Sequence, residues 1–362
     1  MKKKRIVGIV CEYNPFHNGH IYHIQKVKEL LQPDVLVCVM SGNFVQRGEA
    51  SICDKWERAN IAVLHGVDLV VELPFIYATQ SATYFAKAAM EILQLARVQD
   101  FVFGSETNDI HSLQQLAKRS FTPSDKTISN AKAYANTHKH LQSNDILAIN
   151  YLQYKGCMQA HTILRTNAYH GMDIQHDIAS ASAIREALHQ KKDIQHTTPM
   201  KNLQTSSMEV YFPYLKTFLL MTPSSTLSSF FMVDEGIEHH FKKQIIHVNS
   251  YHDFVKRCTS KKYTSSKIRR TILHLLMQTK KSEVDNTKPI NYLRILAFND
   301  IGKHHLALLK NDITIASKFA QIPAYDRKLA LKSAQLYALY SDNSIIKRER
   351  CAPIYIKNKK DM

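Results

Sequence analysis

The 362-residue sequence predicts an α/β fold, in which a doubly wound parallel-sheet domain over residues 1–195 is followed by a mainly α-helical domain over residues 196–362. In the first half, short and continuously apolar segments alternate with helical patterns, which is typical of parallel strands covered on both faces. Beyond about residue 197 Gly becomes rare and helical periodicity dominates. The net charge of +17 is also uneven, at +3 for the first half and +14 for the second.

The first half is predicted to alternate regularly between strands and helices. Strand patterns cover residues 5–13, 34–42, 67–74 and 100–106, and helical patterns cover 20–31, 54–66 and 82–96. The helix at 54–66 has Asp54 as its predicted N-cap and stops at Gly66. In a doubly wound sheet the ligand lies beyond the carboxyl ends of the strands, so we expect the functional site there.

The rest of the chain is predicted to be mostly helical. Segment 121–140 is polar and helical or loop-like. A helix with Ser143-Asn144-Asp145 at its N-cap covers 143–154, a strand and loop cover 161–171, and a capped helix covers 178–192. After the predicted boundary near residue 195, the clearest helical patterns lie at 265–281 and 325–341.

Composition limits the classes of protein that the chain can represent. Apolar residues make up 44% of it, and no apolar run approaches the roughly 20 residues of a membrane span. The N-terminal segment lacks the apolar region and cleavage site of a signal peptide. The six cysteines are scattered, without a C-x-x-C motif or zinc-like spacing. We therefore expect a cytoplasmic protein with reduced thiols, no structural zinc and no membrane partner.

The second half carries most of the positive charge. It has 27 Lys and Arg against 13 Asp and Glu, whereas residues 1–195 have 21 against 18. Such an excess favours a polyanionic partner, although surplus lysines also occur on ordinary solvated surfaces. The densest basic run has Tyr263 interleaved, and we predict that its cations contact nucleic-acid phosphates. Its members are Lys261, Lys262, Lys267, Arg269 and Arg270.

Polar and small residues follow all four predicted strands of the first half. The most unusual set is "EYNPFHNGHIYH" at 12–23, where His17 and His20 stand on either side of the first turn of a helix. Backbone N–H groups and the helix dipole bind phosphate at such a position, and Gly19 lets a ligand approach the backbone. Imidazole near pH 7 donates hydrogen bonds to phosphoryl oxygens. The segment therefore predicts a phosphate site.

Two motifs resemble those of a known superfamily. His17-x-Gly-His20 resembles the signature of the HxGH-type nucleotidylyltransferases, and "IASASAIR" at 178–185 resembles their late Ser/Thr-rich motif, with Ser182 where Thr is usual. The segments "VMSGNFVQRGE", "VDLVVELP", "FGSE" and "NDILAINYL" stand between them in order. Together these segments resemble the bacterial tRNA(Met) cytidine acetate ligase family, from about residue 5 to about residue 302.

This resemblance implies a fold, a reaction and a set of site residues. The fold is a Rossmann-like nucleotidylyltransferase domain followed by a basic, mainly helical tRNA-binding domain. The reaction activates acetate with ATP as acetyl-adenylate, releases pyrophosphate, and transfers acetyl to N4 of the wobble cytidine in elongator tRNA(Met). The implied catalytic residues are His17, His20 and Arg185. The implied ATP-binding residues are Val10, Cys11, Glu12, Tyr13, Asn14, Pro15, Phe16, His17, Asn18, Gly19, His20, Ile21, Tyr22, His23, Gly104, Asn144, Arg165, Ser180 and Ser182.

The residues suit the chemistry of this reaction. Acetate and the α-phosphate of ATP are both anionic, so positive and N–H-rich surroundings must offset their repulsion, and His17, His20, Arg165 and Arg185 are the candidates. We expect Mg²⁺ to bridge the phosphates, although no motif names its ligands. No coenzyme A is expected, because a Gly-rich pyrophosphate loop for it is absent. The cytosine must be splayed out of the anticodon loop while the tRNA is held by its backbone.

Several interpretations stay open from the sequence. Lys55 and Arg58 are either site residues or solvated charges, and His23 is either a packing residue or a contact. Glu12 is a candidate to orient a histidine or a substrate amine. Two other functions share the motifs, namely a metabolite adenylyltransferase of the same superfamily and a non-catalytic RNA-binding protein with a relic nucleotide fold. The intact histidines and the Ser-x-Ser-x-x-Arg segment argue against the second.

Overall fold

A computed structural model of the chain describes residues 4–119, 141–165, 177–201, 203–204, 208–285, 289–339 and 341–358. The predicted segment 121–140 and the predicted loop beyond residue 165 lie outside these residues. The described strands form one eight-stranded sheet in the order β5-β4-β1-β2-β3-β6-β7, with β8 paired to β6. The strands are β1 (Ile6–Cys11), β2 (Val35–Ser41), β3 (Leu69–Leu73), β4 (Asp100–Ser105), β5 (Gln159–Leu164), β6 (Tyr292–Asn299), β7 (Thr314–Ala316) and β8 (Ile354–Ile356).

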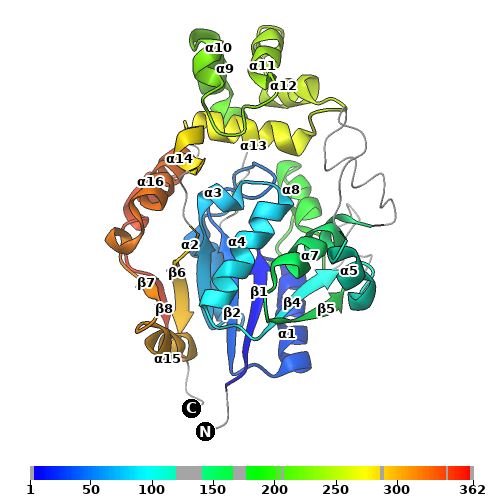
Figure 1. Cartoon of the computed structure of the whole chain (residues 1–362), viewed down its shortest axis with the longest axis vertical. Coiled ribbons are helices and arrows are strands. Elements are labelled where there is room, and N and C mark those ends of the chain that lie inside the picture. The colour runs from blue at the N-terminus through cyan, green and yellow to red at the C-terminus, as the bar shows by residue number, and fades with distance from the viewer. Residues whose placement is uncertain are drawn as a thin grey trace.

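Helices surround the sheet, and α9 to α13 gather at one end of the molecule, opposite both chain termini (Figure 1). In the first half the helices are α1 (Asn18–Leu31), α2 (Lys55–Leu64), α3 (Phe75–Ala78), α4 (Ala82–Leu95), α5 (Ile110–Ala117), α7 (Ser143–Tyr154) and α8 (Ala181–His189). In the second half they are η2 (Met208–Tyr211), α9 (Phe212–Met221), α10 (Ser224–Leu227), α11 (Ile237–Ile245), α12 (Tyr251–Cys258), α13 (Ser265–Leu276), α14 (Lys281–Asp285), α15 (Asp300–Leu309), η3 (Phe319–Gln321), α16 (Ala324–Ala338) and α17 (Ser344–Arg348).

The first half forms the parallel part of the sheet, as the sequence predicted. β1 pairs in parallel with β2 and β4, β2 with β3, and β4 with β5. Successive side chains of each strand enter two different cores. In β2, for example, Cys38 belongs to the core that includes α1 and α2, and Val39 to the core that includes α4 and α7. Both faces of the strands are therefore covered, which explains their continuous apolar runs.

Three strands of the second half extend the same sheet, and the sequence did not predict them. β6 runs antiparallel to β3, and β7 and β8 pair in parallel with β6. A short apolar run such as "YLRILAFN" cannot be distinguished from a buried helix by periodicity alone. The core beside α1 and α2 also continues into α9 to α13 and α16. The second half is therefore mainly helical, but part of it completes the sheet of the first half.

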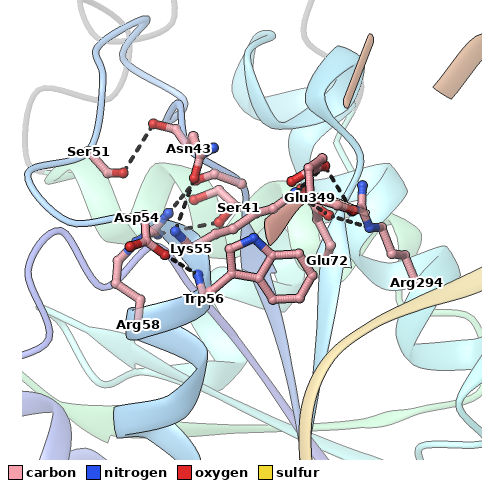
Figure 2. A network of polar contacts seen from close by, with 11 residues as sticks. Ser41, Asn43, Ser51, Asp54, Lys55, Trp56, Arg58, Glu72, Arg294 and Glu349 are labelled. Carbon is pink, nitrogen blue, oxygen red and sulfur yellow. Dashed lines mark hydrogen bonds and ion pairs between the residues drawn. The ribbon is translucent and has the colours of Figure 1, made fainter. Parts of the chain in front are cut away.

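A buried network of two cations and two anions joins β3 to the C-terminal segment (Figure 2). Lys55 Nζ lies 2.7 Å from a Glu72 oxygen and 2.8 Å from a Glu349 oxygen. Arg294 lies 3.0 Å from Glu72 and 2.8 Å from Glu349, and none of the four side chains is more than 8% exposed. Burial opposes ionisation of Glu349, but Lys55 and Arg294 outweigh it and hold the pKa of this carboxyl below its usual value.

Arg58 is fully buried near this network and holds the loops that follow β1 and β2. Its guanidinium donates hydrogen bonds to the backbone carbonyls of Glu12 and Gly42, and its Nε donates to the carbonyl of Cys53 at 3.0 Å. Both open interpretations of Lys55 and Arg58 are therefore wrong. These cations are neither solvated nor in the cavity described below, because buried carboxylates and carbonyls surround them.

Replacement of Lys55 by Met tests the importance of the buried network. In Lys55→Met, Arg294 alone faces two buried carboxylates, so the free energy of unfolding should fall by about 3–5 kcal/mol. Urea denaturation measures this change. The matched control is Lys26→Met, which removes an exposed partner of Glu29 and should cost less than about 1 kcal/mol. Equal and small losses in both variants would contradict the assigned role.

Candidate active site

A cavity of about 460 Å³ lies at the carboxyl ends of the parallel strands. It is lined by residues that end or follow β1, β2, β4 and β5, and by residues at the starts of α1, α4, α7 and α8. The dipoles of these helix N-termini favour negative charge at one place, and at α7 the Glu106 carboxylate already supplies part of it. The end of β3 itself does not line the cavity, because Glu72 belongs to the buried network.

Most residues implied for nucleotide binding or catalysis line this cavity. They are Val10, Cys11, Glu12, Tyr13, Asn14, His17, Gly19, His20, Tyr22, His23, Gly104, Asn144, Arg165, Ser180, Ser182 and Arg185. Pro15, Phe16, Asn18 and Ile21 do not line it. Phe16 is buried in the core, and the Asn18 side chain donates to the carbonyls of Asp177 and His196, which fixes the start of α1. A turn followed by a helix presents only part of a continuous segment to one side.

His17 and His20 form a capping box at the start of α1. His17 is the N-cap, and its Nδ1 accepts a hydrogen bond from the backbone N–H of Gly19 at 3.1 Å. The backbone N–H of His17 donates in turn to Nδ1 of His20 at 3.2 Å. The two imidazoles therefore accept the backbone N–H groups that Ser and Glu side chains accept in an ordinary capping box. Their ring centroids lie 3.9 Å apart.

The capping box fixes the tautomer of both histidines. Burial, with Arg165 and Arg185 nearby, lowers the pKa of His17 to about 3. Burial, the neighbouring histidines and Arg165 hold the pKa of His20 well below its usual value, so both rings are neutral near pH 7. A neutral imidazole whose Nδ1 accepts a hydrogen bond carries its proton on Nε2. Each histidine therefore keeps one Nε2–H donor for a ligand.

Ser180, Ser182 and Arg185 form a second cluster at the start of α8. Ser180 is the N-cap, and its Oγ accepts a hydrogen bond from the backbone N–H of Ala183 at 3.0 Å. Arg185 donates to Ser182 Oγ at 3.2 Å and to the carbonyl of Asn14 at 2.6 Å. The guanidinium thus ties α8 to the turn before α1, and both helix N-termini share one wall of the cavity.

Gly104, Arg165 and Asn144 lie at the ends of β4 and β5 and the start of α7. A Cβ at Gly104 would lie 3.0 Å from Arg165 Cγ, so the absence of a side chain lets Arg165 cross this position. Asn144 donates a hydrogen bond to the carboxylate of Glu106. The N-cap of α7 is Gln142 rather than the predicted Ser143-Asn144-Asp145 segment, which forms the first turn. The Glu106 carboxylate accepts the backbone N–H of Asp145 in that turn and so takes the place of a side-chain cap.

A hairpin between β2 and α2 forms a wall of the cavity that the sequence analysis did not assign. Its residues Val45, Gln46, Arg47 and Glu49 line the cavity. Val45 N–H donates to the Glu49 carbonyl and Gly48 N–H to the Val45 carbonyl, each at 2.9 Å. The polar segment "SGNFVQRGE" after the second strand and its Arg-Gly pair were the available signals for a tight turn.

Helix α13 holds the tip of this hairpin. Arg269 forms an ion pair with Glu49, and Arg270 Nη1 donates to the Gln46 carbonyl at 3.3 Å. Gly48 has φ +75°, and a Cβ there would lie 2.6 Å from the backbone nitrogen of Arg270, so only Gly fits. Burial lowers the pKa of Arg270 to about 10. From the sequence we predict that these two arginines contact nucleic-acid phosphates. Their guanidinium groups instead bind Glu49 and the Gln46 carbonyl of the hairpin, which does not suit that prediction.

Two of the three lysines of the basic run, Lys261 and Lys262, are exposed, and Lys267 is partly buried. Lys262 and Lys267 lie 3.8 and 3.4 Å from a carboxylate oxygen of Glu235, and 5.4 and 5.2 Å from the centre of the Tyr263 ring. Arg269 and Arg270 thus face the cavity wall, while the lysines remain available to a partner that replaces Glu235.

Three further observations concern metal ions, membrane-spanning helices and thiols. In the described part of the chain, no group of three or more His, Cys, Asp or Glu residues is placed to hold a metal ion. No helix among the described residues is long and apolar enough to cross a bilayer. All six cysteines are free thiols, as the sequence predicted.

Comparison with known proteins identifies the family. A family model described as HIGH Nucleotidyl Transferase matches residues 4–350. The tRNA(Met) cytidine acetate ligase of Limosilactobacillus reuteri is 36% identical over 333 residues, covering 86% of this chain and 88% of that one. The one of Caldicellulosiruptor bescii is 33% identical over 399 residues, covering 98% and 100%. The chain belongs to the tRNA(Met) cytidine acetate ligase family.

Solved structures agree with this membership in the ligase family. The apo form of Thermotoga maritima TmcAL is 29% identical, with a TM-score of 0.87 over 98% of this chain and 100% of that one. TmcAL with bound alpha-thio ATP is 28% identical, with a TM-score of 0.85 over the same shares. The predicted family and the predicted α/β nucleotidylyltransferase fold are therefore confirmed.

The neutral state of His17 predicts how stability depends on pH. The folded imidazole stays neutral down to about pH 3, whereas an unfolded one binds a proton near pH 6.5. The unfolded state therefore binds more protons between these values, and the free energy of unfolding falls as the pH falls. His17→Asn keeps a good N-cap acceptor but removes this titration.

The slope of unfolding free energy against pH should therefore be shallower in His17→Asn, by up to about 1.4 kcal/mol per pH unit. Urea denaturation at several pH values between about 4.5 and 7 measures the slope. Parallel curves for the wild type and the variant would contradict a neutral, buried His17.

Proposed function

We propose that this chain is an ATP-dependent ligase that activates acetate as acetyl-adenylate and transfers the acetyl group to N4 of the wobble cytidine of elongator tRNA(Met), forming N4-acetylcytidine. The observation that carries the proposal is one cavity in which the two histidine Nε2–H donors meet the N-termini of α1, α7 and α8. The names of the family members and the alpha-thio ATP bound to TmcAL support ATP, acetate and tRNA as substrates.

In the proposed first step an acetate oxygen attacks the α-phosphorus of ATP. The bond from this phosphorus to the bridging oxygen breaks, pyrophosphate leaves, and acetyl-adenylate forms. The Nε2–H groups of His17 and His20 donate to the phosphoryl oxygens, where negative charge builds. Because both tautomers are fixed by the backbone of α1, these donors need little reorganisation. Arg185, with Ser180 and Ser182, binds the leaving phosphates at the start of α8.

The remaining residues of the cavity hold the nucleoside end of ATP in this proposal. Gly104 and Arg165 lie at the ends of β4 and β5, and Asn144 lies at the start of α7. Mg²⁺ would be held mainly by oxygens of the ATP phosphates and by water, and it would supply positive charge that offsets theirs.

The helical end of the molecule is the proposed tRNA-binding region. Its boundary with the proposed ATP-binding region lies near residue 195. Lys261, Lys262 and Lys267 are its proposed phosphate contacts. The carboxylate that pairs with two of them is about half exposed, so a phosphate can replace it at low cost. Arg269 and Arg270 connect this region to the cavity wall instead of binding RNA.

The direct test is incubation with ATP, radiolabelled acetate and bulk bacterial tRNA. The proposal requires ATP-dependent label in cytidine, released as N4-acetylcytidine on digestion of the tRNA. Label in a small nucleotide-linked metabolite would favour a metabolite adenylyltransferase. Failure to consume ATP under any of these conditions would leave an RNA-binding protein.

Two substitutions of His20 separate its two ring nitrogens. His20→Asn keeps an acceptor near the Nδ1 position but loses the Nε2–H donor, whereas the longer side chain of His20→Gln carries an N–H near the Nε2 position. Acetate-dependent pyrophosphate release should fall by roughly two or more orders of magnitude in His20→Asn and by less in His20→Gln. Release at the parental rate in His20→Asn would contradict the assigned donor.

Removal of Lys261 and Lys262 tests the proposed tRNA surface. Each phosphate contact contributes about 0.7 (single strand) to 0.9 (duplex) to the slope of log affinity against log salt concentration. The double variant Lys261→Ala/Lys262→Ala should therefore lower the slope for tRNA binding by about 1.4 to 1.8. Lys26→Ala, an exposed lysine on α1, is the control with an unchanged slope. The parental slope in the double variant would mean that these lysines form a solvated face.

A further inference from the structure

Two carboxylates line a cavity that is otherwise suited to anions. Among the described lining residues these are Glu12, directly after β1, and Glu49, on the hairpin. A carboxylate repels a bound triphosphate, so its presence in the cavity calls for a separate role. Glu49 has one, because its ion pair with Arg269 attaches the hairpin to α13. Glu12 has no ion pair within 4 Å among the described residues.

The position of Glu12 is fixed from two sides. Its backbone carbonyl accepts a hydrogen bond from the buried guanidinium of Arg58. Its carboxylate Oε1 accepts the backbone N–H of Gln46 at 2.8 Å, from the hairpin tip that rests on α13. The second carboxylate oxygen has no hydrogen bond from a described residue. Glu12 thus lines the cavity with one carboxylate oxygen that is not committed to a described residue.

The other basic groups of the cavity are less suited to accept a proton. His17 and His20 already use Nδ1 as an acceptor and carry their proton on Nε2. His23 has a buried Nε2 without a hydrogen-bond partner among the described residues, but burial and Arg165 lower its pKa to about 4. Burial raises the pKa of Glu12, against the Gln46 N–H and the nearby charges of Arg47, Arg185 and Arg58, which favours proton uptake by its carboxylate.

We propose that Glu12 is the general base of acetyl transfer. In this step N4 of cytosine attacks the carbonyl carbon of acetyl-adenylate, the bond from that carbon to the phosphate oxygen breaks, and AMP leaves with the bonding electrons. The proton that N4 loses moves to the free oxygen of Glu12 and then to water. An exocyclic cytosine amine is a weak nucleophile, so removal of this proton is where a base acts. The inference rests on the proposed function and adds a catalytic residue to it.

The test separates the two half-reactions. Wild type and Glu12→Gln are mixed with ATP, radiolabelled acetate and tRNA, quenched at short times, and analysed for label in acetyl-adenylate and in N4-acetylcytidine. Gln keeps an oxygen for the Gln46 N–H but is not a base. Acetyl transfer should slow by about 10²- to 10⁴-fold, clearly more than acetyl-adenylate formation slows, so acetyl-adenylate should accumulate. Glu186→Gln, an exposed carboxylate next to Arg185 that does not line the cavity, is the matched control and should change neither.

The pH profile gives a second readout that a positioning role would not change. Transfer by the wild type should fall as the pH drops through the pKa of Glu12, and this acid limb should be absent in Glu12→Gln. The charged and titratable groups around Glu12 are Arg47 of the hairpin, Arg185 of α8, Arg58 of α2 and Tyr151 of α7. The arginines stay charged over this range and the phenol stays neutral, so none of them produces the limb.

Two results would overturn the inference, and both differ from a failure of the proposed function. An equal loss of acetyl-adenylate formation and transfer in Glu12→Gln would make Glu12 a nucleotide-binding residue. An acid limb that persists in Glu12→Gln would assign the base elsewhere, with His23→Gln as the variant that removes it. If Glu12→Gln unfolds, Glu12→Asp must retain the limb with slower transfer. Absence of N4-acetylcytidine with the wild type would instead contradict the proposed function itself.

Discussion

The buried guanidinium of Arg58 is the constraint on which the geometry of the cavity depends. It holds the carbonyl of Glu12 after β1, the carbonyl of Gly42 after β2, and the carbonyl of Cys53 where the hairpin returns to α2. The Arg58 guanidinium thus fixes the two ends of the hairpin, at Gly42 and Cys53. It also fixes Glu12, which precedes the turn that carries His17 and His20. A buried charge of this kind is stable only while its carbonyl partners stay in place, so the two strand ends and the hairpin keep one arrangement. The side chains that face the ligand are positioned from this point.

The sequence predicted those parts of the molecule whose signals are local. Continuous apolar runs give the parallel strands, and the His17-x-Gly-His20 and Ser180-x-Ser182 motifs stand at helix N-termini that all open to one cavity. Contacts between distant residues left no such signal. Lys55 meets Glu349 and Arg269 meets Glu49 across 294 and 220 residues of sequence, so these cations looked like site or surface residues. β6 was missed because a short buried strand and a buried helix share the same apolar pattern.

The positive charge of the second half serves two purposes that composition cannot separate. Lys216 donates to the carbonyl of Val248 at 2.7 Å, and Lys242 donates to the carbonyls of Leu219 and Thr222 at 2.9 and 2.7 Å, where α9 ends. These ammonium groups satisfy carbonyls at the ends of helices, a role that Lys often has. They keep their charge, so they still attract a polyanion over a Debye length of about 8–10 Å, but they are held to the protein backbone. The net charge therefore supports a polyanionic partner. The lysines expected to contact that partner are those that do not already donate to backbone carbonyls.

In the proposed mechanism the Nε2–H groups of His17 and His20 face the reacting phosphate, and Glu12 faces the acyl group. A crystal structure with a non-hydrolysable acetyl-adenylate analogue, in which a sulfamate replaces the phosphate, tests both halves at once. The account predicts sulfamate oxygens within about 2.7–3.2 Å of Nε2 of His17 or His20, with both Nδ1 contacts to the backbone retained. It also predicts the acetyl carbonyl on the side of Glu12 and the hairpin. An analogue bound with its sulfamate away from both histidines, or with its acetyl group at the Gly104 and Arg165 end, would contradict the account.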